Sequence, residues 1–317
     1  MQAQDDKKHR RRMRTTTLVL LVLLLAAAPR SHGSTVLVLY PDAPPPYQHA
    51  FEQIIGGLKR SVNQSLETLP LPGNYDIPTI ERWIDTHKKG DTTLVLLGQR
   101  ALDAYAQLST RLPAFVGGVS RLYDKANLPG ISMTIATPVV LATVHELLPA
   151  TQTIIVFYNA AFSGWVPPAP QTTAGHDLTI RSIAVTDAQT AVKEISRIVE
   201  TVDPQTTALW FMEGTISLNT ELILPFVLEE TWKRRIPAFS DAPSYVKRGM
   251  LFALYPDYDG MGVELGSRLQ PAAPRPPRGI AFTHAAHFAI NTRTAQHLGI
   301  PLRTEFMERA DAVFPAP

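Results

Sequence analysis

Cysteine is absent from the 317-residue sequence. The chain therefore has no disulfide, no cysteine metal ligand, no thiol nucleophile and no N-terminal cysteine for lipid modification. Such a chain has to be held together by its hydrophobic core alone, and 45% hydrophobic residues in a chain of this length can supply that core. The length suggests roughly two domains of about 100 to 200 residues each.

Long hydrophobic runs are also scarce. The run LVLLVLLLAAA at residues 18–28 is too short to span a membrane comfortably, and it follows the basic stretch KKHRRRMR. The small residues of PRSHGS then offer a cleavage site after Gly33. We interpret residues 1–33 as a signal peptide and expect export to the periplasm as a freely soluble protein that is not a lipoprotein. An uncleaved N-terminal anchor is the alternative.

An excess of positive charge is missing once this leader is removed. The leader carries seven of the 30 basic and two of the 28 acidic residues, which leaves 23 and 26 and a net charge of about −3. Nothing basic remains to indicate binding to nucleic acid or to an anionic membrane surface.

The usual signatures of catalysis are missing as well. Neither Ser120 nor Ser163 lies in a G-x-S-x-G frame, and His145 begins no HExxH pattern because Pro149 occupies the fourth position after it. The pair Gly56-Gly57 lies inside an expected helix, where it favours close packing rather than phosphate binding. We therefore expect no enzyme activity and no cofactor.

Histidines provide one alternative, a metal site. His284 and His287 are three residues apart, and His297 follows. In a strand, residues at i and i+3 point to opposite faces, and no carboxylate stands beside them. We therefore expect no metal site.

Short apolar runs alternate with longer amphipathic ones along the rest of the chain. This β-α alternation predicts α/β architecture, with parallel sheets covered by helices. Strands are expected at residues 35–40, 92–98, 113–119, 153–159, 178–185, 207–213, 236–240 and 250–257. Helices are expected at residues 47–64, 77–89, 137–148, 187–202 (with Asp187 as N-cap) and 217–235 (disturbed at Pro225), after strand 92–98, and from about Asn291.

Two sets of such elements are separated by NLPGISMTIATP at residues 127–138, a stretch that contains Gly and Pro and is typical of a crossover. We expect two Rossmann-like lobes joined by hinge crossovers, with a cleft between them lined by the carboxyl ends of the strands. Lobe 1 is predicted to comprise residues 34–135 and 256–290, and lobe 2 residues 136–255 and 291–317.

A repeated phrase marks two of the strand ends. LYPD occurs at the end of strand 35–40 and again at the end of strand 250–257. Proline ends each strand because it has no N–H to donate. Asp42 and Asp257 are candidate acceptors facing the cleft, and Tyr47 and Tyr258 are candidate aromatic walls. The alternative is that each aspartate is a turn or helix N-cap residue, and the two roles are compatible.

Several stretches of the sequence together resemble a known family. The stretches that carry the resemblance are APPPYQHAFEQIIGGL, LVLLGQRALDAY, LPAFVGGV, NLPGISMTIATPVVLATVHELLPATQTIIVFYN, the long run from TALWFMEG to GVELGSRL, and AINTRTAQHLGIPLRTEFMERADAVFP. In order and spacing they are similar to ABC-transporter substrate-binding proteins of the type I periplasmic class, in particular the type that binds aromatic amino acids such as tryptophan. The resemblance spans nearly all of residues 34–317.

The resemblance implies two Rossmann-like lobes, a hinged cleft, and binding without chemistry. Carried over position by position, it implies ligand contacts from loops at the strand ends. These positions are Asp42 to Tyr47, Gly98, Gln99, Gly117 to Ser120, Asn159, Glu213 to Thr215, Ser240, Asp241, Asp257 and Tyr258.

Two features depart from the family pattern. Residues 162–177, FSGWVPPAPQTTAGHD, are short and proline-rich where relatives carry a helix, and Trp165 lies within them. Relatives often have an aspartate at the position of Glu213, so this departure puts in doubt whether the chain keeps the contact that would hold a ligand's amine. The other tryptophans, Trp83, Trp210 and Trp232, fit core faces and are expected to serve packing.

The sequence thus predicts a monomeric periplasmic component of an ABC importer. It would bind a small molecule, such as an amino acid or an aromatic compound, in the cleft between the lobes. It would close around this ligand by hinge motion and deliver it to an inner-membrane permease. The alternative, which the departure at residues 162–177 motivates, is a periplasmic sensory or interaction module that partners a membrane sensor kinase or cyclase.

Overall fold

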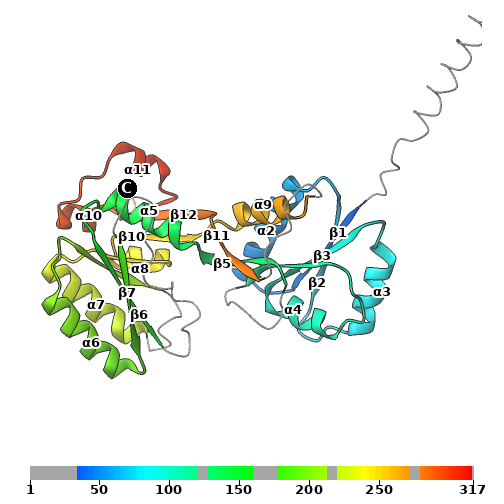
Figure 1. The fold of residues 1–317 in the computed structure, drawn as a ribbon, viewed down its shortest axis with the longest axis horizontal. Coiled ribbons are helices and arrows are strands. Elements are labelled where there is room, and N and C mark those ends of the chain that lie inside the picture. The colour runs from blue at the N-terminus through cyan, green and yellow to red at the C-terminus, as the bar shows by residue number, and fades with distance from the viewer. Residues whose placement is uncertain (1–33, 120–127, 160–177, 213–219, 271–278, 316–317) are drawn as a thin grey trace, which may run out of the picture.

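The computed structural model describes residues 34–119, 128–159, 178–212, 220–270 and 279–315. They form two α/β lobes, each built on one β-sheet with helices against its faces, and the lobes lie end to end along the long axis of the molecule (Figure 1). In these described segments, no helix combines the length and the hydrophobicity needed to cross a membrane.

Lobe 1 contains a six-stranded sheet in the order β11-β5-β4-β3-β1-β2, and every pairing in it is parallel. Its strands are β1 (Thr35–Pro41), β2 (Ser65–Leu71), β3 (Thr92–Leu97), β4 (Ala114–Val119), β5 (Gly130–Ile135) and β11 (Ile280–Thr283). Its helices are α2 (Tyr47–Ser61), α3 (Ile77–His87), α4 (Gly98–Gln107) and α9 (Tyr258–Arg268).

Lobe 2 contains a seven-stranded sheet in the order β13-β12-β10-β9-β8-β6-β7. It is parallel except that β12 runs antiparallel to β10. Its strands are β6 (Thr153–Asn159), β7 (Thr179–Val185), β8 (Thr207–Phe211), β9 (Ala238–Ser240), β10 (Phe252–Pro256), β12 (Ala286–Asn291) and β13 (Ala312–Phe314). Its helices are α5 (Thr137–Leu147), α6 (Ala188–Thr201), α7 (Thr220–Arg234), α8 (Pro243–Arg248), α10 (Thr292–Leu298) and α11 (Thr304–Arg309).

Both faces of each sheet are buried, which explains why the central strands are continuous apolar runs. In β1, Val36 and Val38 pack with residues of α2 and α9, whereas Leu37 and Leu39 pack on the other face with residues of α3 and α4. The sheet of lobe 2 is likewise covered by α6 and α7 on one face and by α5 with the C-terminal elements on the other.

The predicted strands and helices are present with small shifts at their ends, and Asp187 and Asn291 are N-caps as expected. The elements that were not predicted are the strands β2, β5, β11, β12 and β13 and the helices α8, α9 and α11. The residues of β2 alternate poorly and include Pro70, which the sheet tolerates because β2 is an edge strand. The stretch predicted as a crossover at residues 127–138 contains β5, a strand of lobe 1, and only its end crosses between the lobes.

Three chain segments cross between the lobes. They lie at Ala136 between β5 and α5, at Asp257 between β10 and α9, and at His284 and Ala285 between β11 and β12. The backbone N–H of Ala136 donates to Thr283 O at 2.7 Å, and that of Asp257 donates to Ala285 O at 3.2 Å, so the crossings are bonded to one another. The predicted lobe boundary at residue 290 is therefore wrong. It falls inside β12, a strand of lobe 2.

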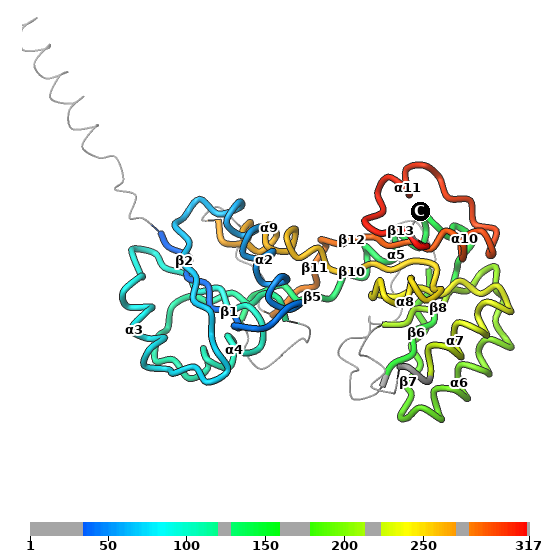
Figure 2. Tube along the Cα trace, turned by 180° about the vertical axis from the view of Figure 1, so that it is seen from behind, coloured from blue at the N-terminus to red at the C-terminus, as the bar shows by residue number. Residues whose placement is uncertain are grey.

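Helices α2 and α9 pack backbone against backbone through glycine. A Cβ on Gly57 would lie 1.9 Å from Asp259 O, and one on Gly262 would lie 2.1 Å from Ile54 O. Arg60 also forms an ion pair with Asp259, and Gln270 Nε2 donates to Ser61 O at 2.6 Å. The close packing predicted for the Gly56-Gly57 pair is confirmed for Gly57, and it fixes the first segment after the crossing at Asp257 to lobe 1 (Figure 2).

This contact gives a matched pair of substitutions. Gly57→Ala should lower the free energy of unfolding by about 1 to 3 kcal/mol, because the added methyl group overlaps the backbone of α9. Gly56→Ala should instead raise it by about 0.5 to 1 kcal/mol, because the nearest atom to that Cβ is 3.7 Å away and alanine favours the helix. Urea denaturation of both variants measures the difference, and equal effects would contradict the backbone contact.

Candidate functional site

The carboxyl ends of the parallel strands in the two lobes face one another. Strand β5 runs out of lobe 1 into α5 of lobe 2, and β1, β3 and β4 are parallel to it within the sheet. Strand β10 runs the opposite way, out of lobe 2 into α9, and β9, β8 and β6 are parallel to it. The loops after these strands therefore meet between the lobes, where open α/β sheets bind ligands.

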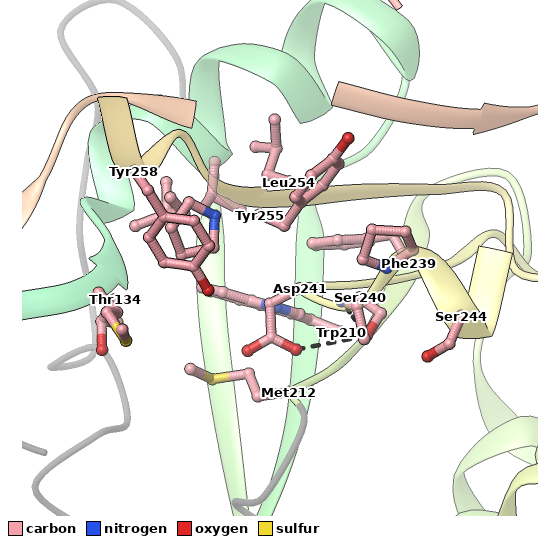
Figure 3. Close-up of a pocket in the computed structure, with 16 residues that line it drawn as sticks. Thr134, Trp210, Met212, Phe239, Ser240, Asp241, Ser244, Leu254, Tyr255 and Tyr258 are labelled. Carbon is pink, nitrogen blue, oxygen red and sulfur yellow. Dashed lines mark hydrogen bonds between the residues drawn. The ribbon is translucent and has the colours of Figure 1, made fainter. Parts of the chain in front are cut away.

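A cavity of about 370 Å³ lies at this junction. It is formed by the ends of β8, β9 and β10, the start of α8, and the last residues of β5 (Figure 3). The lining residues are Met133, Thr134, Ile135, Val140, Trp210, Met212, Phe239, Ser240, Asp241, Ala242, Pro243, Ser244, Leu254, Tyr255, Pro256 and Tyr258.

Aromatic rings form much of the wall. Trp210 stacks on Phe239 with 5.6 Å between ring centroids and 20° between ring planes, and Phe239 stacks in turn on Phe252 at 4.6 Å and 5°. Tyr258 adds another ring, and Tyr255 also lines the cavity while its ring lies 5.3 Å from that of His287. Burial raises the pKa of Tyr255, and the negative charge of Asp311 adds to the effect, so this phenol stays protonated at neutral pH.

Asp241 is the only charged side chain among the described residues that line the cavity. The Ser240 hydroxyl accepts the backbone N–H of Ala242 at 3.2 Å and donates to Asp241 Oδ1 at 3.4 Å. Ser240 is 1% exposed, so the turn after β9 holds the carboxylate in a fixed position. Figure 3 shows Asp241, Met212 and Tyr258 around one opening. A carboxylate in an apolar wall favours a positively charged group opposite it.

Ser240 and Tyr258, two of the predicted site residues, line this cavity. Asp257 lies next to Tyr258 and is the N-cap of α9, because its Oδ1 accepts the backbone N–H of Gly260 at 2.9 Å. The capping alternative is thus confirmed for Asp257. Its carboxylate also lies 3.6 Å from His287 Nε2.

Asp42, Tyr47 and Gln99 lie in lobe 1 and do not line the cavity. Asp42 is not a helix N-cap, because α2 begins at Tyr47 with Pro46 at the N-cap position, so this part of the alternative is wrong. Asp42 is exposed, and Tyr47 is 69% exposed beside it at the carboxyl edge of the sheet. Gln99 Nε2 donates to Asp103 at 2.6 Å, whereas its Oε1 is buried with no hydrogen-bond partner.

Three predicted site residues cannot be placed at the level of their side chains. Asn159 ends β6 at the carboxyl edge of lobe 2. Ser120 and Glu213, together with the proline-rich segment 162–177, lie outside the described residues.

His287 bridges two carboxylates at the crossing. Its Nδ1 lies 2.7 Å from Asp311 Oδ1, on the opposite side of the ring from Asp257. His284 contributes its backbone N–H to Glu264 Oε1 at 2.9 Å. Within the segments that the structure describes, no group of three or more His, Asp or Glu side chains is arranged to hold a metal ion.

Sequence reasoning assigned the tryptophans only in part. Trp210 is buried, as expected of a core residue, but it also lines the cavity. The packing prediction for Trp232 is wrong, since this side chain is 38% exposed. Tyr255 was missed, although it is the tyrosine of the second LYPD phrase, and so was Phe239. The sequence offered one signal for both residues: each immediately precedes the last residue of its strand.

Comparison with known proteins decides the family. The profile described as ABC transporter substrate binding protein matches residues 120–314, more than half of the chain. The chain belongs to this family. Its members are non-enzymatic binding proteins that act in the periplasm or outside the cell, and membership implies a small-molecule ligand and a permease partner. No curated protein matches the chain in a sequence search.

Among solved structures, one substrate-binding protein has the same fold, and two further ones are less similar. The ligand-free, open structure of CD0873, a substrate-binding protein with adhesive properties from Clostridium difficile, is 14% identical with a TM-score of 0.57, and the match covers 88% of this chain and 98% of that one. A domain from Streptococcus pneumoniae in complex with L-Trp is 17% identical with a TM-score of 0.46, over 89% and 100%. A periplasmic ribose ABC transporter protein from Conexibacter woesei is 12% identical with a TM-score of 0.43, over 83% and 93%. The type I periplasmic-binding fold predicted from the sequence is confirmed.

Substitutions at Asp257 separate its two contacts. Asp257→Ala should lower the free energy of unfolding by about 1 kcal/mol, because α9 loses its N-cap. Asp257→Asn should restore most of that loss, because asparagine caps as well as aspartate while lacking the charge that faces His287. Chemical denaturation of both variants is the measurement. If Asn is as destabilising as Ala, the contact with His287 matters more than the cap.

Proposed function

We propose that this protein is the solute-binding component of an ABC importer and that its ligand carries an aromatic ring and a protonated amine. The observation that supports this ligand class is the position of Asp241, the one charged side chain among the described residues of a cavity lined mostly by apolar and aromatic residues. A volume of about 370 Å³ falls within the range of small-molecule sites. Aromatic amino acids and aromatic amines satisfy both requirements.

Each part of the ligand has a partner in this proposal. The amine faces the Asp241 carboxylate, whose position Ser240 fixes by its hydrogen bond. The ring lies against Trp210, Phe239 and Tyr258, where burial of aromatic surface supplies most of the affinity. Lobe 2 and the hinge strands thus bind the ligand first.

Hinge closure completes the site. Asp42, Tyr47 and Gln99 stand at the carboxyl edge of lobe 1, which faces the cavity across the crossings. An exposed tyrosine at that edge gains apolar contact when the lobes close, and contacts from both lobes favour the closed state over the open one. Asn159, Asp257, Ser120 and Glu213 complete the proposed set of ligand contacts.

Export and delivery follow from the same proposal. Residues 1–33 act as a signal peptide removed near Gly33, and the protein, a monomer without a lipid anchor, carries its ligand through the periplasm to an inner-membrane permease.

Two ligands that differ in charge test the assignment. Tryptamine and 3-methylindole share the indole ring, but tryptamine carries an ammonium and 3-methylindole carries no charge. Tryptamine at about 100 times its dissociation constant should stabilise the protein by about 2.7 kcal/mol, a shift of a few degrees in Tm, whereas 3-methylindole at the same concentration should give a clearly smaller shift. Thermal shift and titration calorimetry measure both, and L-tryptophan is the third ligand of the panel.

Asp241→Asn provides the matching variant. It should weaken tryptamine binding by about 10- to 100-fold, since a hydrogen bond to a charged group contributes roughly 1.5 to 3 kcal/mol. Asp85→Asn removes an exposed carboxylate of lobe 1 and should leave binding unchanged. Equal affinity for the two indole ligands would contradict the role of Asp241. No shift with any aromatic amine or amino acid, in a folded protein, would favour the sensory alternative.

A further inference from the structure

A second cavity, of about 500 Å³, lies in lobe 2 on the side away from the site described above. It is bounded by the last two turns of α7, the end of α8 and the start of α10. The backbone N–H of Asn291 at the end of β12 donates to Leu251 O just before β10, so this groove lies at the amino edge of the strands whose carboxyl ends form the Asp241 cavity. Helices α7 and α10 stand at the end of the molecule remote from lobe 1 (Figures 1 and 2).

The groove is strongly basic. Among the described residues, Lys233, Lys247, Arg248 and Arg293 line it, and the one carboxylate that lines it is that of Glu229. Glu229 Oε1 is already engaged by Lys233 Nζ at 2.5 Å. The chain beyond residue 33 has a net charge of about −3, so the groove is positively charged although the rest of that chain is slightly negative.

Two of these cations are uncompensated. Lys247 and Arg293 are both exposed, and neither has an ion-pair partner in the parts of the chain that the structure describes. They come from different elements, α8 and α10, and reach the same groove. Like charges held near one another repel, and an anion placed between them removes that cost. The planar guanidinium of Arg293 suits carboxylate and phosphate groups.

Trp232 gives the groove an aromatic wall. Its ring stacks on the His297 imidazole with 3.7 Å between centroids and 3° between planes, and His297 Nε2 lies 2.9 Å from Trp232 O. The contact with Trp232 O holds the imidazole against the indole, and the Trp232 side chain remains 38% exposed. A tryptophan kept partly in solvent beside unpaired cations is a surface for a flat apolar group.

We propose that this groove binds a small organic anion in which carboxylate or phosphate groups adjoin a flat apolar moiety. Lys247 and Arg293 contact the anionic groups, and Trp232 contacts the flat moiety. The groove and the Asp241 cavity prefer opposite charges and lie at opposite edges of one sheet, so both can be occupied at once. The site is independent of the ligand and the importer role proposed above.

The probe that tests this site is 1-naphthyl phosphate, with neutral 1-naphthol as its matched counterpart. Titration calorimetry of the purified protein at low ionic strength should give saturable binding of one naphthyl phosphate, weakened by added salt, and no comparable binding of naphthol. The double variant Lys247→Ala/Arg293→Ala should lose at least about tenfold in affinity. Both residues are exposed, and circular dichroism and Tm establish that the variant is folded.

A control double variant tests whether binding depends on this groove or only on the overall positive charge of the protein. Lys89→Ala/Lys193→Ala removes two exposed lysines elsewhere and should change the affinity by less than about twofold. Trp232→Leu should weaken naphthyl phosphate binding while leaving that of pyrophosphate unchanged. Three results would overturn the proposal: no saturable binding, equal losses in both double variants, or full affinity in the variant that lacks Lys247 and Arg293.

Discussion

The arrangement of the two lobes depends on the contact between α2 and α9. Glycine on both helices brings their backbones together, and the ion pair of Arg60 with Asp259 and the hydrogen bond from Gln270 lie along the same interface. Because α9 follows the crossing at Asp257 directly, this interface determines where the chain re-enters lobe 1. Glu264 of α9 also accepts hydrogen bonds from Thr283 Oγ1 at 3.0 Å and from the backbone N–H of His284 at 2.9 Å, so the same helix holds the third crossing.

The architecture was accessible from the sequence where both faces of a sheet are buried, because such strands are continuous apolar runs flanked by amphipathic helices. The sequence did not predict strands whose formation depends on pairing with strands that are distant in the chain. β2 has a weak pattern with Pro70 and forms only as an edge strand against β1, and β5 was hidden by the Gly and Pro residues around it. β12 joins lobe 2 by antiparallel pairing with β10, a partner no local pattern indicates.

The sequence likewise predicted some of the residues that line the cavity but not others. The rule that ligands bind at strand carboxyl ends located Ser240 and Tyr258, whose positions the chain order alone determines. It did not assign Tyr255 or Phe239, because whether a residue near a strand end faces a helix or the cavity depends on the pleat and on what covers the sheet. Trp232 was misassigned for a related reason: it follows the periodicity of α7, yet that helix face ends at a groove instead of the core.

The return of the chain into lobe 1 has a consequence for the order of assembly. Lobe 1 uses residues before Ala136 together with α9 and β11, and β11 ends at Thr283. During synthesis the N-terminal strands therefore emerge long before the helix that covers α2 and the strand that completes the sheet edge at β5. Apolar side chains such as Ile54 and Leu58, fully buried in the finished protein, stay open to water or to chaperones over that interval. A newly made chain cannot complete this lobe until most of the second lobe has been translated.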